Sequence, residues 1–301
     1  MLPTPIRPPA QTSTNSRIVA AFAPRIRQPL FLPACISRDA GSFERAEQRS
    51  GTLLSCLMGS LGRRKKENMG SATNSETLTT LLFDIDGTLL ISQRAGGRAI
   101  DTVFEQVFGR PHSIELRLHG RTDRGILTEL FNAEGRELTD AEFAAFIDSY
   151  LRELDQNLHQ QPATVLPGVT QLLPWLAEHP QVALGLLTGN VRQGAQTKLR
   201  HTGLEHFFAF GGFGDAHAHR DDVAREAAHA AQSHLQHRFC PQSVVVIGDT
   251  VHDITCGKAI GAKTLAVLTG GAQREELAAA QPDWICTDLR QGFSILQHLL
   301  G

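Results

Sequence analysis

Two aspartates stand two residues apart at the end of a short apolar run, in the sequence LLFDIDGTLL that spans residues 81–90. Along an extended strand, residues i and i+2 point to the same side, so Asp84 and Asp86 can face one point while Ile85 turns into the core. Two carboxylates at the mouth of a buried strand repel each other and are costly to desolvate. A divalent cation, a shared proton or a role in phosphoryl transfer would offset that cost.

Polar residues also end two later apolar runs, so the pattern of the first run is repeated. Thr188 follows the run Val182–Leu187, and Asp249 follows the run Ser243–Gly248. Short apolar runs alternate with helical patterns, which predicts an α/β fold with a parallel sheet covered by helices on both faces. Ligands of such a sheet bind at the carboxyl ends of its strands. We therefore expect Asp84, Thr188 and Asp249 to lie close together.

The apolar spacing predicts the elements of this α/β part of the chain. Strands are expected at Thr80–Asp84, Val182–Leu187, Ser243–Gly248, Ala262–Leu268 and Asp283–Cys286. Helices are expected at Val169–Glu178, Val191–His201, Asp222–His237, Val251–Ile260 and Arg290–Leu299.

A long segment without a strand pattern separates the first strand from the others. Helices are expected within it at Gly97–Phe108, Arg121–Asn132 and Thr139–His159. Thr139 and Glu142 fit a capping box, which would open the third of these helices. We expect a helical domain over residues 92–165, inserted into an α/β core that comprises residues 76–91 and 166–301.

The string DIDGTL at residues 84–89 resembles motif I of the haloacid dehalogenase-like hydrolase superfamily, most of whose members are phosphatases. LGLLTGN at residues 184–190 resembles motif II, and VVVIGDTVHD at residues 244–253 resembles motif IV. The set is most similar to the phosphoglycolate phosphatase-like branch. The resemblance implies a Rossmann-like core and a helical cap that closes over the site, excludes water and selects the substrate.

The resemblance also implies the catalytic and metal-binding roles. Asp84 is expected to attack phosphorus and form an aspartyl-phosphate, with Asp86 as general acid and base. Mg²⁺ is expected as the cofactor, because it offsets the repulsion between the nucleophile and a phosphate. Its expected ligands are Asp84, Asp249 and the backbone carbonyl of Asp86, with Asp253 one helical turn further on.

Phosphate-binding residues are expected from motif II and from a basic residue. Thr188, Gly189 and Asn190 would bind the phosphoryl oxygens through the threonine hydroxyl and backbone N–H groups. The lysine and proline usual in the family's basic motif are absent, and His219-Arg220-Asp221 stands there instead. Arg220 is our choice, because it lies 29 residues before Asp249 at a loop-to-helix junction and because arginine can bind phosphate through two donors. The alternatives, Lys198 and Lys258, fall on helices away from the strand ends.

In the expected cap, the string His119-Gly120-Arg121-Thr122-Asp123 places a cation near the start of a helix. Relatives with a similar string use such an arginine to contact substrate. Arg121 is therefore the expected substrate contact, with a structural ion pair as the alternative.

These features together predict a Mg²⁺-dependent phosphatase that hydrolyses a small phosphate monoester. A phosphomutase is the first alternative, because it shares motif I and the phospho-aspartate. A dehalogenase is disfavoured by Asp86, which that branch lacks. A domain that only binds a phosphorylated ligand is disfavoured because such a domain has no need of the nucleophile Asp84. The substrate and the oligomeric state are not predicted.

Bulk composition argues against several other classes of protein. The net charge of −2 over 301 residues indicates neither nucleic acid nor an acidic surface as an obligate partner. Five cysteines without a CxxC pair indicate reduced thiols. The chain lacks an apolar stretch of the roughly 18–20 residues that span a bilayer. We expect a cytoplasmic protein with a small phosphorylated metabolite as its partner and no membrane association.

Residues 1–75 are rich in Pro, Arg, Ser and Thr, show no sustained period and are expected to be disordered. Three interpretations remain open. Translation starts at Met69, or the segment is an Arg-rich organelle transit sequence. Alternatively, the basic patch Arg63–Lys66 recruits nucleic acid.

Overall fold

The computed structural model describes residues 77–301, so the expected disorder of residues 1–75 and the patch Arg63–Lys66 lie outside the described residues. Six strands form one sheet in the order β5-β4-β1-β6-β7-β8, and every neighbouring pair is parallel. The strands are β1 (Leu78–Phe83), β4 (Val182–Leu187), β5 (Phe210–Gly212), β6 (Phe239–Gly248), β7 (Lys263–Val267) and β8 (Trp284–Cys286). The predicted α/β fold is confirmed.

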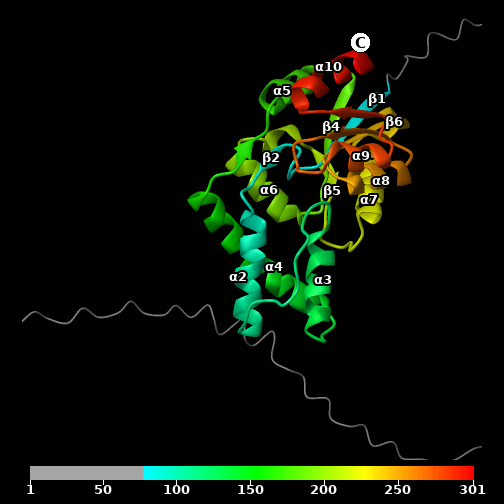
Figure 1. The fold of residues 1–301 in the computed structure, drawn as a ribbon. Coiled ribbons are helices and arrows are strands. Elements are labelled where there is room, and N and C mark those ends of the chain that lie inside the picture. Colours follow the sequence, from blue (N-terminus) through cyan, green and yellow to red (C-terminus); the bar gives the residue numbers. More distant parts are fainter. Residues whose placement is uncertain (1–76) are drawn as a thin grey trace, which may run out of the picture. The chain divides into compact units, whose positions relative to one another are not determined.

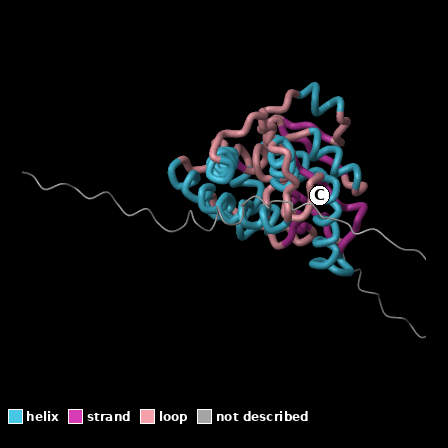
Figure 2. Tube along the Cα trace, turned by 90° about the horizontal axis from the view of Figure 1, so that it is seen from below, coloured by secondary structure: helices cyan, strands magenta, loops and turns pink. Residues whose placement is uncertain are grey.

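Helices cover both faces of this sheet (Figures 1 and 2). They are α5 (Val169–Glu178), α6 (Arg192–His201), α7 (Arg220–Leu235), α8 (Val251–Ala259), α9 (Arg274–Ala279) and α10 (Leu289–Leu300). Successive residues of a strand point to opposite faces. Phe83 accordingly packs in a cluster with Leu172 of α5, whereas Leu82 packs in another with Ala227 of α7. Burial on both faces explains why the strands are nearly continuous apolar runs.

The helical insertion consists of α2 (Ala95–Phe108), α3 (Asp123–Ala133) and α4 (Asp140–Gln160). Its helices surround an apolar cluster of their own, in which Phe104, Phe131 and Phe146 are fully buried. Figure 1 shows the three helices grouped at one end of the sheet. The capping box of Thr139 and Glu142 is present at the start of α4. The exact limits of a separate cap domain remain a prediction.

Some elements differ from the sequence-based expectation. The pattern does not predict β2 (Leu90–Ile91) and β3 (Thr164–Val165), which pair antiparallel at the base of the helical insertion. Two residues are too few to show the alternation of a strand. The three residues of β5, Phe-Gly-Gly, are also too few. The strand β6 begins four residues earlier than Ser243, and α7 begins at Arg220 rather than Asp222. Among residues 77–301, no helix is long and apolar enough to cross a membrane.

Candidate active site

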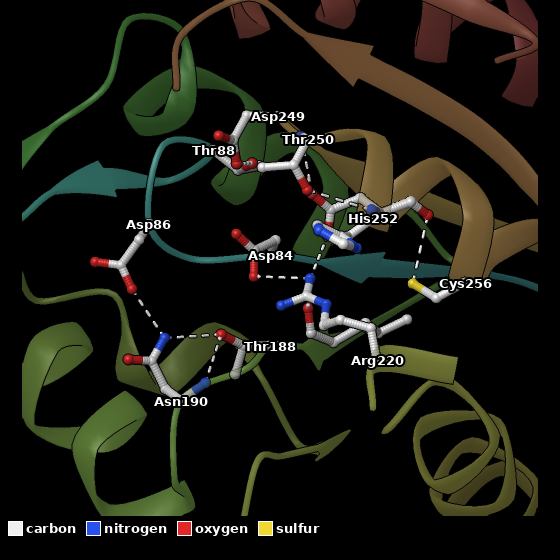
Figure 3. Close-up of polar contacts among 12 residues, drawn as sticks. Asp84, Asp86, Thr88, Thr188, Asn190, Arg220, Asp249, Thr250, His252 and Cys256 are labelled. Atoms are coloured by element: carbon white, nitrogen blue, oxygen red, sulfur yellow. Dashed lines mark hydrogen bonds and ion pairs between the residues drawn. The ribbon is translucent and has the colours of Figure 1, made fainter. Parts of the chain in front are cut away.

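The carboxyl ends of β4, β1 and β6 meet at one edge of the sheet, because these three strands are parallel neighbours. Asp84 follows β1, Thr188 follows β4 and Asp249 follows β6, and all three are buried. Figure 3 shows their side chains around one region. The predicted convergence of the three residues is therefore confirmed.

Arg220, the first residue of α7, binds the proposed nucleophile. Its Nη2 lies 3.1 Å from Asp84 Oδ1 (Figure 3). The same Nη2 also donates to Asp253 Oδ1. Burial disfavours the charge of this guanidinium, but Asp253 and Asp84 raise the pKa of Arg220 above its usual value. Its Nε is buried without a hydrogen-bond partner in the described part of the chain. Arg220 thus stays charged beside the proposed nucleophile.

Three buried carboxylates, those of Asp84, Asp249 and Asp253, each offer an oxygen within 4.8 Å of the others. Oδ1 of Asp249 accepts a hydrogen bond from the Thr88 hydroxyl at 3.2 Å, but Oδ2 has no partner among residues 77–301. Burial raises the pKa of Asp84 to about 7, although Arg220 lowers it. Burial, Asp253 and Asp84 raise the pKa of Asp249 well above its ordinary value.

This cluster fits a hard divalent cation. One arginine does not balance three buried carboxylates, and isolated buried charges are costly. An all-oxygen set with an unsatisfied carboxylate oxygen is what Mg²⁺ prefers. The backbone also leaves room for that oxygen, because a Cβ at Gly270 would lie 1.6 Å from Asp249 Oδ2. The residues present therefore fit the Mg²⁺ ion that the sequence predicts.

Asp86 lies on the other side of Asp84, and three donors hold its carboxylate. The Ser92 hydroxyl donates to Oδ1 at 3.0 Å, while Asn190 Nδ2 and Lys198 Nζ donate to Oδ2 at 2.8 and 2.6 Å. Burial opposes ionisation, but Lys198 and these hydrogen bonds keep the pKa of Asp86 below its ordinary value. The carboxylate is therefore fixed in the ionised form beside an ammonium group.

Lys198 contradicts the expectation that it lies away from the strand ends. It is only 4% exposed, and its Nζ donates to Asn190 Oδ1 at 2.7 Å in addition to Asp86. Helical side chains lean toward the helix N-terminus, and α6 begins next to the site. That lean lets Lys198 reach the site from the middle of α6, although no strand-end pattern in the sequence points to it. Lys258, by contrast, donates to the carbonyl of Ala280 and is outside the site.

The segment Thr188-Gly189-Asn190 forms the third side of the site. The Thr188 hydroxyl accepts hydrogen bonds from Asn190 Nδ2 at 2.8 Å and from its backbone N at 3.4 Å. The N–H of Gly189 has no partner in the described part of the chain, so it is available to a phosphoryl oxygen. The first amides of α6 are already bonded, Val191 N to Asp123 and Arg192 N to Asp215. The anion-binding capacity therefore rests on Gly189 more than on the helix itself.

The start of α3 brings the helical insertion against this segment. Asp123 N donates to the Gly189 carbonyl at 2.8 Å, and Asp123 Oδ2 accepts from Val191 N at 2.7 Å. Burial raises the pKa of Asp123 to about 6. A Cβ at Gly189 would lie 1.9 Å from the carbonyl oxygen of Arg121, so this position requires glycine.

Gly189→Ala is expected to force α3 away from the site and to lower kcat/KM at least about 100-fold, because small misplacements of substrate-positioning groups are costly. Steady-state kinetics with p-nitrophenyl phosphate measures the loss. Gly203→Ala is the control for lost stability alone, because its φ is 72° and nothing lies within 4 Å of its Cβ. Equal activity in the two variants would contradict the close contact of α3 with the site.

Arg121, the predicted substrate contact, is partnered inside the helical insertion. It forms an ion pair with Glu129 and also contacts the carbonyl of Gly125 at 3.4 Å. Its substrate role remains a prediction. Arg94 also borders the cavity, and it has no ion-pair partner among residues 77–301. No pattern in the sequence identifies this arginine.

A cavity of about 420 Å³ lies between the strand ends and the helical insertion. Its polar wall contains Asp84, Asp86, Thr188, Lys198 and Arg220. Its apolar wall comes from the insertion and contains Ile100, Leu118, Ile126 and Tyr150. The cavity therefore presents charged groups on one side and places the insertion where it can discriminate between small ligands.

Comparisons with known proteins agree with this architecture. The chain is 29% identical over 215 residues to pyrophosphatase PpaX of Bacillus pumilus, a match that covers 70% of this chain and 93% of that protein. It is 26% identical over 230 residues to phosphoglycolate phosphatase of Synechococcus elongatus, covering 73% and 100%.

Solved structures give the same fold. A hydrolase from Pseudomonas syringae aligns with a TM-score of 0.56 at 21% identity, covering 73% of this chain and 97% of that one. CbbY from Rhodobacter sphaeroides, solved in complex with phosphate, aligns with a TM-score of 0.52 at 17% identity, covering 71% and 95%. Residues 81–267 of this chain match the haloacid dehalogenase-like hydrolase family. The chain belongs to the haloacid dehalogenase-like hydrolase family.

Proposed function

We propose that this phosphatase is Mg²⁺-dependent and hydrolyses a small phosphate monoester through an aspartyl-phosphate on Asp84. The observation that supports the proposal best is the buried cluster of Asp84, Asp249 and Asp253, joined by Arg220 at a cavity of about 420 Å³. The curated relatives are phosphatases, and a related structure holds phosphate. The cavity volume suits a small metabolite and not a macromolecular substrate.

In the first step, a carboxylate oxygen of Asp84 attacks phosphorus, and the bond from phosphorus to the leaving oxygen breaks. Bound Mg²⁺ would supply the positive charge that lets one anion approach another, held by Asp84, Asp249, Asp253 and the Asp86 carbonyl. Arg220 and the Gly189 N–H would stabilise the charge on the phosphoryl oxygens. Asp86 is ionised in the free site, so it would first take up a proton from the substrate monoanion and then pass that proton to the leaving alkoxide.

In the second step, Asp86 removes a proton from water, and the water oxygen attacks phosphorus. The bond between Asp84 and phosphorus breaks, which releases inorganic phosphate and restores the carboxylate. The ionised state in which Lys198 holds Asp86 suits this base role. The apolar wall from the helical insertion would limit the number of waters that reach the intermediate.

Pyrophosphate is a second candidate substrate, and the pairing of Lys198 with Asp86 favours it. This pairing keeps Asp86 ionised, which opposes proton donation to a strongly basic alkoxide. Inorganic phosphate is a much weaker base and leaves more readily without a proton. Five of the relatives that match this chain are named pyrophosphatases.

The test is phosphate release by the purified full chain with excess Mg²⁺ from p-nitrophenyl phosphate, phosphoglycolate, sugar phosphates and pyrophosphate. We expect turnover of at least one substrate, and its loss in chelator. A transferred phosphate on a second sugar phosphate, without free phosphate, would indicate a mutase instead. An inactive protein across the whole set would contradict the proposed function.

Lys198→Met is expected to lower kcat about 100-fold, because Asp86 and Asn190 both lose the ammonium that orients them. Lys198→Arg keeps a charge and should recover part of the rate. Lys258→Met is the matched control on α8, since the hydrogen bond of that lysine goes to the Ala280 carbonyl, which is outside the site. A normal kcat in Lys198→Met would show that Asp86 needs no cation beside it.

A further inference from the structure

A second cluster of ligand-type side chains lies outside the active-site cavity, where α4 meets α6. Asp155 and His159 stand one turn apart on α4, and His201 is the last residue of α6. One carboxylate oxygen and one nitrogen from each histidine lie within 4.8 Å of one another. None of the three residues borders the cavity. The proposed phosphatase reaction uses none of them.

The contacts inside this cluster already link the two helices. Nε2 of His201 lies 2.8 Å from Asp155 Oδ1, and Nδ1 of His159 lies 3.6 Å from Asp155 Oδ2. The two imidazole rings meet edge to face, with their centroids 4.5 Å apart. The side chains of Asp155 and His159 are 52% and 69% exposed, so an ion from solvent reaches them freely.

We propose that Asp155, His159 and His201 form a binding site for a divalent transition metal ion, of which Zn²⁺ is the representative. Two imidazoles and one carboxylate suit Zn²⁺ and Co²⁺, whereas Mg²⁺ prefers oxygen ligands only. Residues i and i+4 of a helix share one face, which is why Asp155 and His159 act together. The ion completes a three-residue set, and water fills its remaining positions.

Binding replaces the hydrogen that now lies between His201 Nε2 and Asp155 Oδ1. The metal–nitrogen bond forms at Nε2, and that hydrogen moves to the other ring nitrogen or, if both nitrogens carry one, to water. His159 has its Nδ1 2.9 Å from the backbone carbonyl of Asp155. Nδ1 is also the nitrogen that faces Asp155 Oδ2, so its hydrogen moves to Nε2 when the metal–nitrogen bond forms at Nδ1.

An ion at this site would connect the helical insertion to the α/β part of the chain. The helix α4 carries Tyr150 and α6 carries Lys198, and both of these side chains border the cavity. Tyr150 lies five residues before Asp155, and Lys198 lies three residues before His201. A metal bound by the C-terminal ends of α4 and α6 would therefore restrain the relative position of Tyr150 and Lys198 in the cavity wall.

The test is a titration of the full chain with Co²⁺ in excess Mg²⁺, followed by its visible absorption. The excess Mg²⁺ is added to occupy the all-oxygen cluster of Asp84, Asp249 and Asp253, and nitrogen ligands change the Co²⁺ spectrum. We expect Co²⁺ to bind and Zn²⁺ to displace it. His159→Ala and His201→Ala should each weaken Co²⁺ binding at least about tenfold. His229→Ala is the control, because that histidine is exposed on α7 and lies outside the cluster of Asp155, His159 and His201.

Thermal unfolding gives a second readout that does not depend on catalysis. Zn²⁺ at about 100 times its Kd should raise the Tm of the wild-type protein by about 5 °C. The same addition should have little effect on His201→Ala. Equal Co²⁺ affinity in the wild type and both histidine variants would overturn the proposed site, as would a failure of Co²⁺ to bind when Mg²⁺ is present.

Discussion

Asp84→Asn is expected to lower kcat for phosphate release at least about 10⁴-fold, because a carboxamide cannot form the acyl phosphate. The amide has nearly the same shape and can still accept the hydrogen bond that Arg220 Nη2 makes at 3.1 Å. The fold should therefore persist. The measurement is kcat with p-nitrophenyl phosphate at saturating Mg²⁺, together with the Tm of the same preparation.

The control for this prediction is Asp140→Asn on α4. That carboxylate is 92% exposed and pairs only with Arg124, so its loss should leave kcat within about twofold of the wild type. A folded Asp84→Asn variant that retains more than about 1% of the wild-type kcat would exclude Asp84 as the nucleophile.

Asp249→Asn is expected to abolish Mg²⁺-dependent turnover, by at least about 10³-fold, and at the same time to stabilise the metal-free protein. Burial raises the pKa of Asp249 well above its ordinary value, and its Oδ2 has no partner in the described part of the chain. A neutral amide at this position avoids the cost of either burying the charge of the carboxylate or protonating it. The metal-free variant should therefore unfold about 5 °C above the wild type at pH 7.

The pH dependence of the metal-free wild type follows from the same carboxylates. The pKa of Asp84 is about 7 in the folded chain against an ordinary 3.8, so the folded state binds more protons between these values. Stability in chelator should therefore fall as the pH rises from about 4 to about 7. Asp249→Asn should reduce this slope. Thermal scans in chelator at several pH values measure both effects, and a variant less stable than the wild type at pH 7 would contradict them.

The elements that the sequence predicts well are those with long apolar periods. The strand β4 and the helix α5 have the predicted bounds, because each is long enough for its buried face to repeat. The strand β5 is different, since Phe210-Gly211-Gly212 has almost no side-chain pattern. It forms because the edge of β4 is open to a further strand. Glycine is needed at position 212, because a Cβ there would lie 2.2 Å from the carbonyl oxygen of Val223 and would prevent this close packing. The spacing of apolar residues along the chain does not reveal such tertiary contacts.

The residues of the site likewise fall into those that the sequence predicts and those that depend on tertiary packing. Asp84, Thr188 and Asp249 could be placed together from sequence because parallel strands deliver their carboxyl ends to one edge. Lys198 reaches Asp86 from the middle of a helix, which depends on how α6 packs and not on any strand end. Tyr150 borders the cavity for a similar reason, because the position of its side chain depends on how the helices of the insertion pack.

The central claim is a covalent phosphate on Asp84, and chemical trapping tests it most directly. The full chain is mixed with p-nitrophenyl phosphate and Mg²⁺, quenched in acid during turnover, reduced with borohydride and mapped by peptide mass spectrometry. Borohydride reduces an acyl phosphate to an alcohol, so we expect Asp84, and no other aspartate, to be converted to homoserine. Conversion of a different carboxylate, or turnover with no conversion at any carboxylate, would contradict the mechanism.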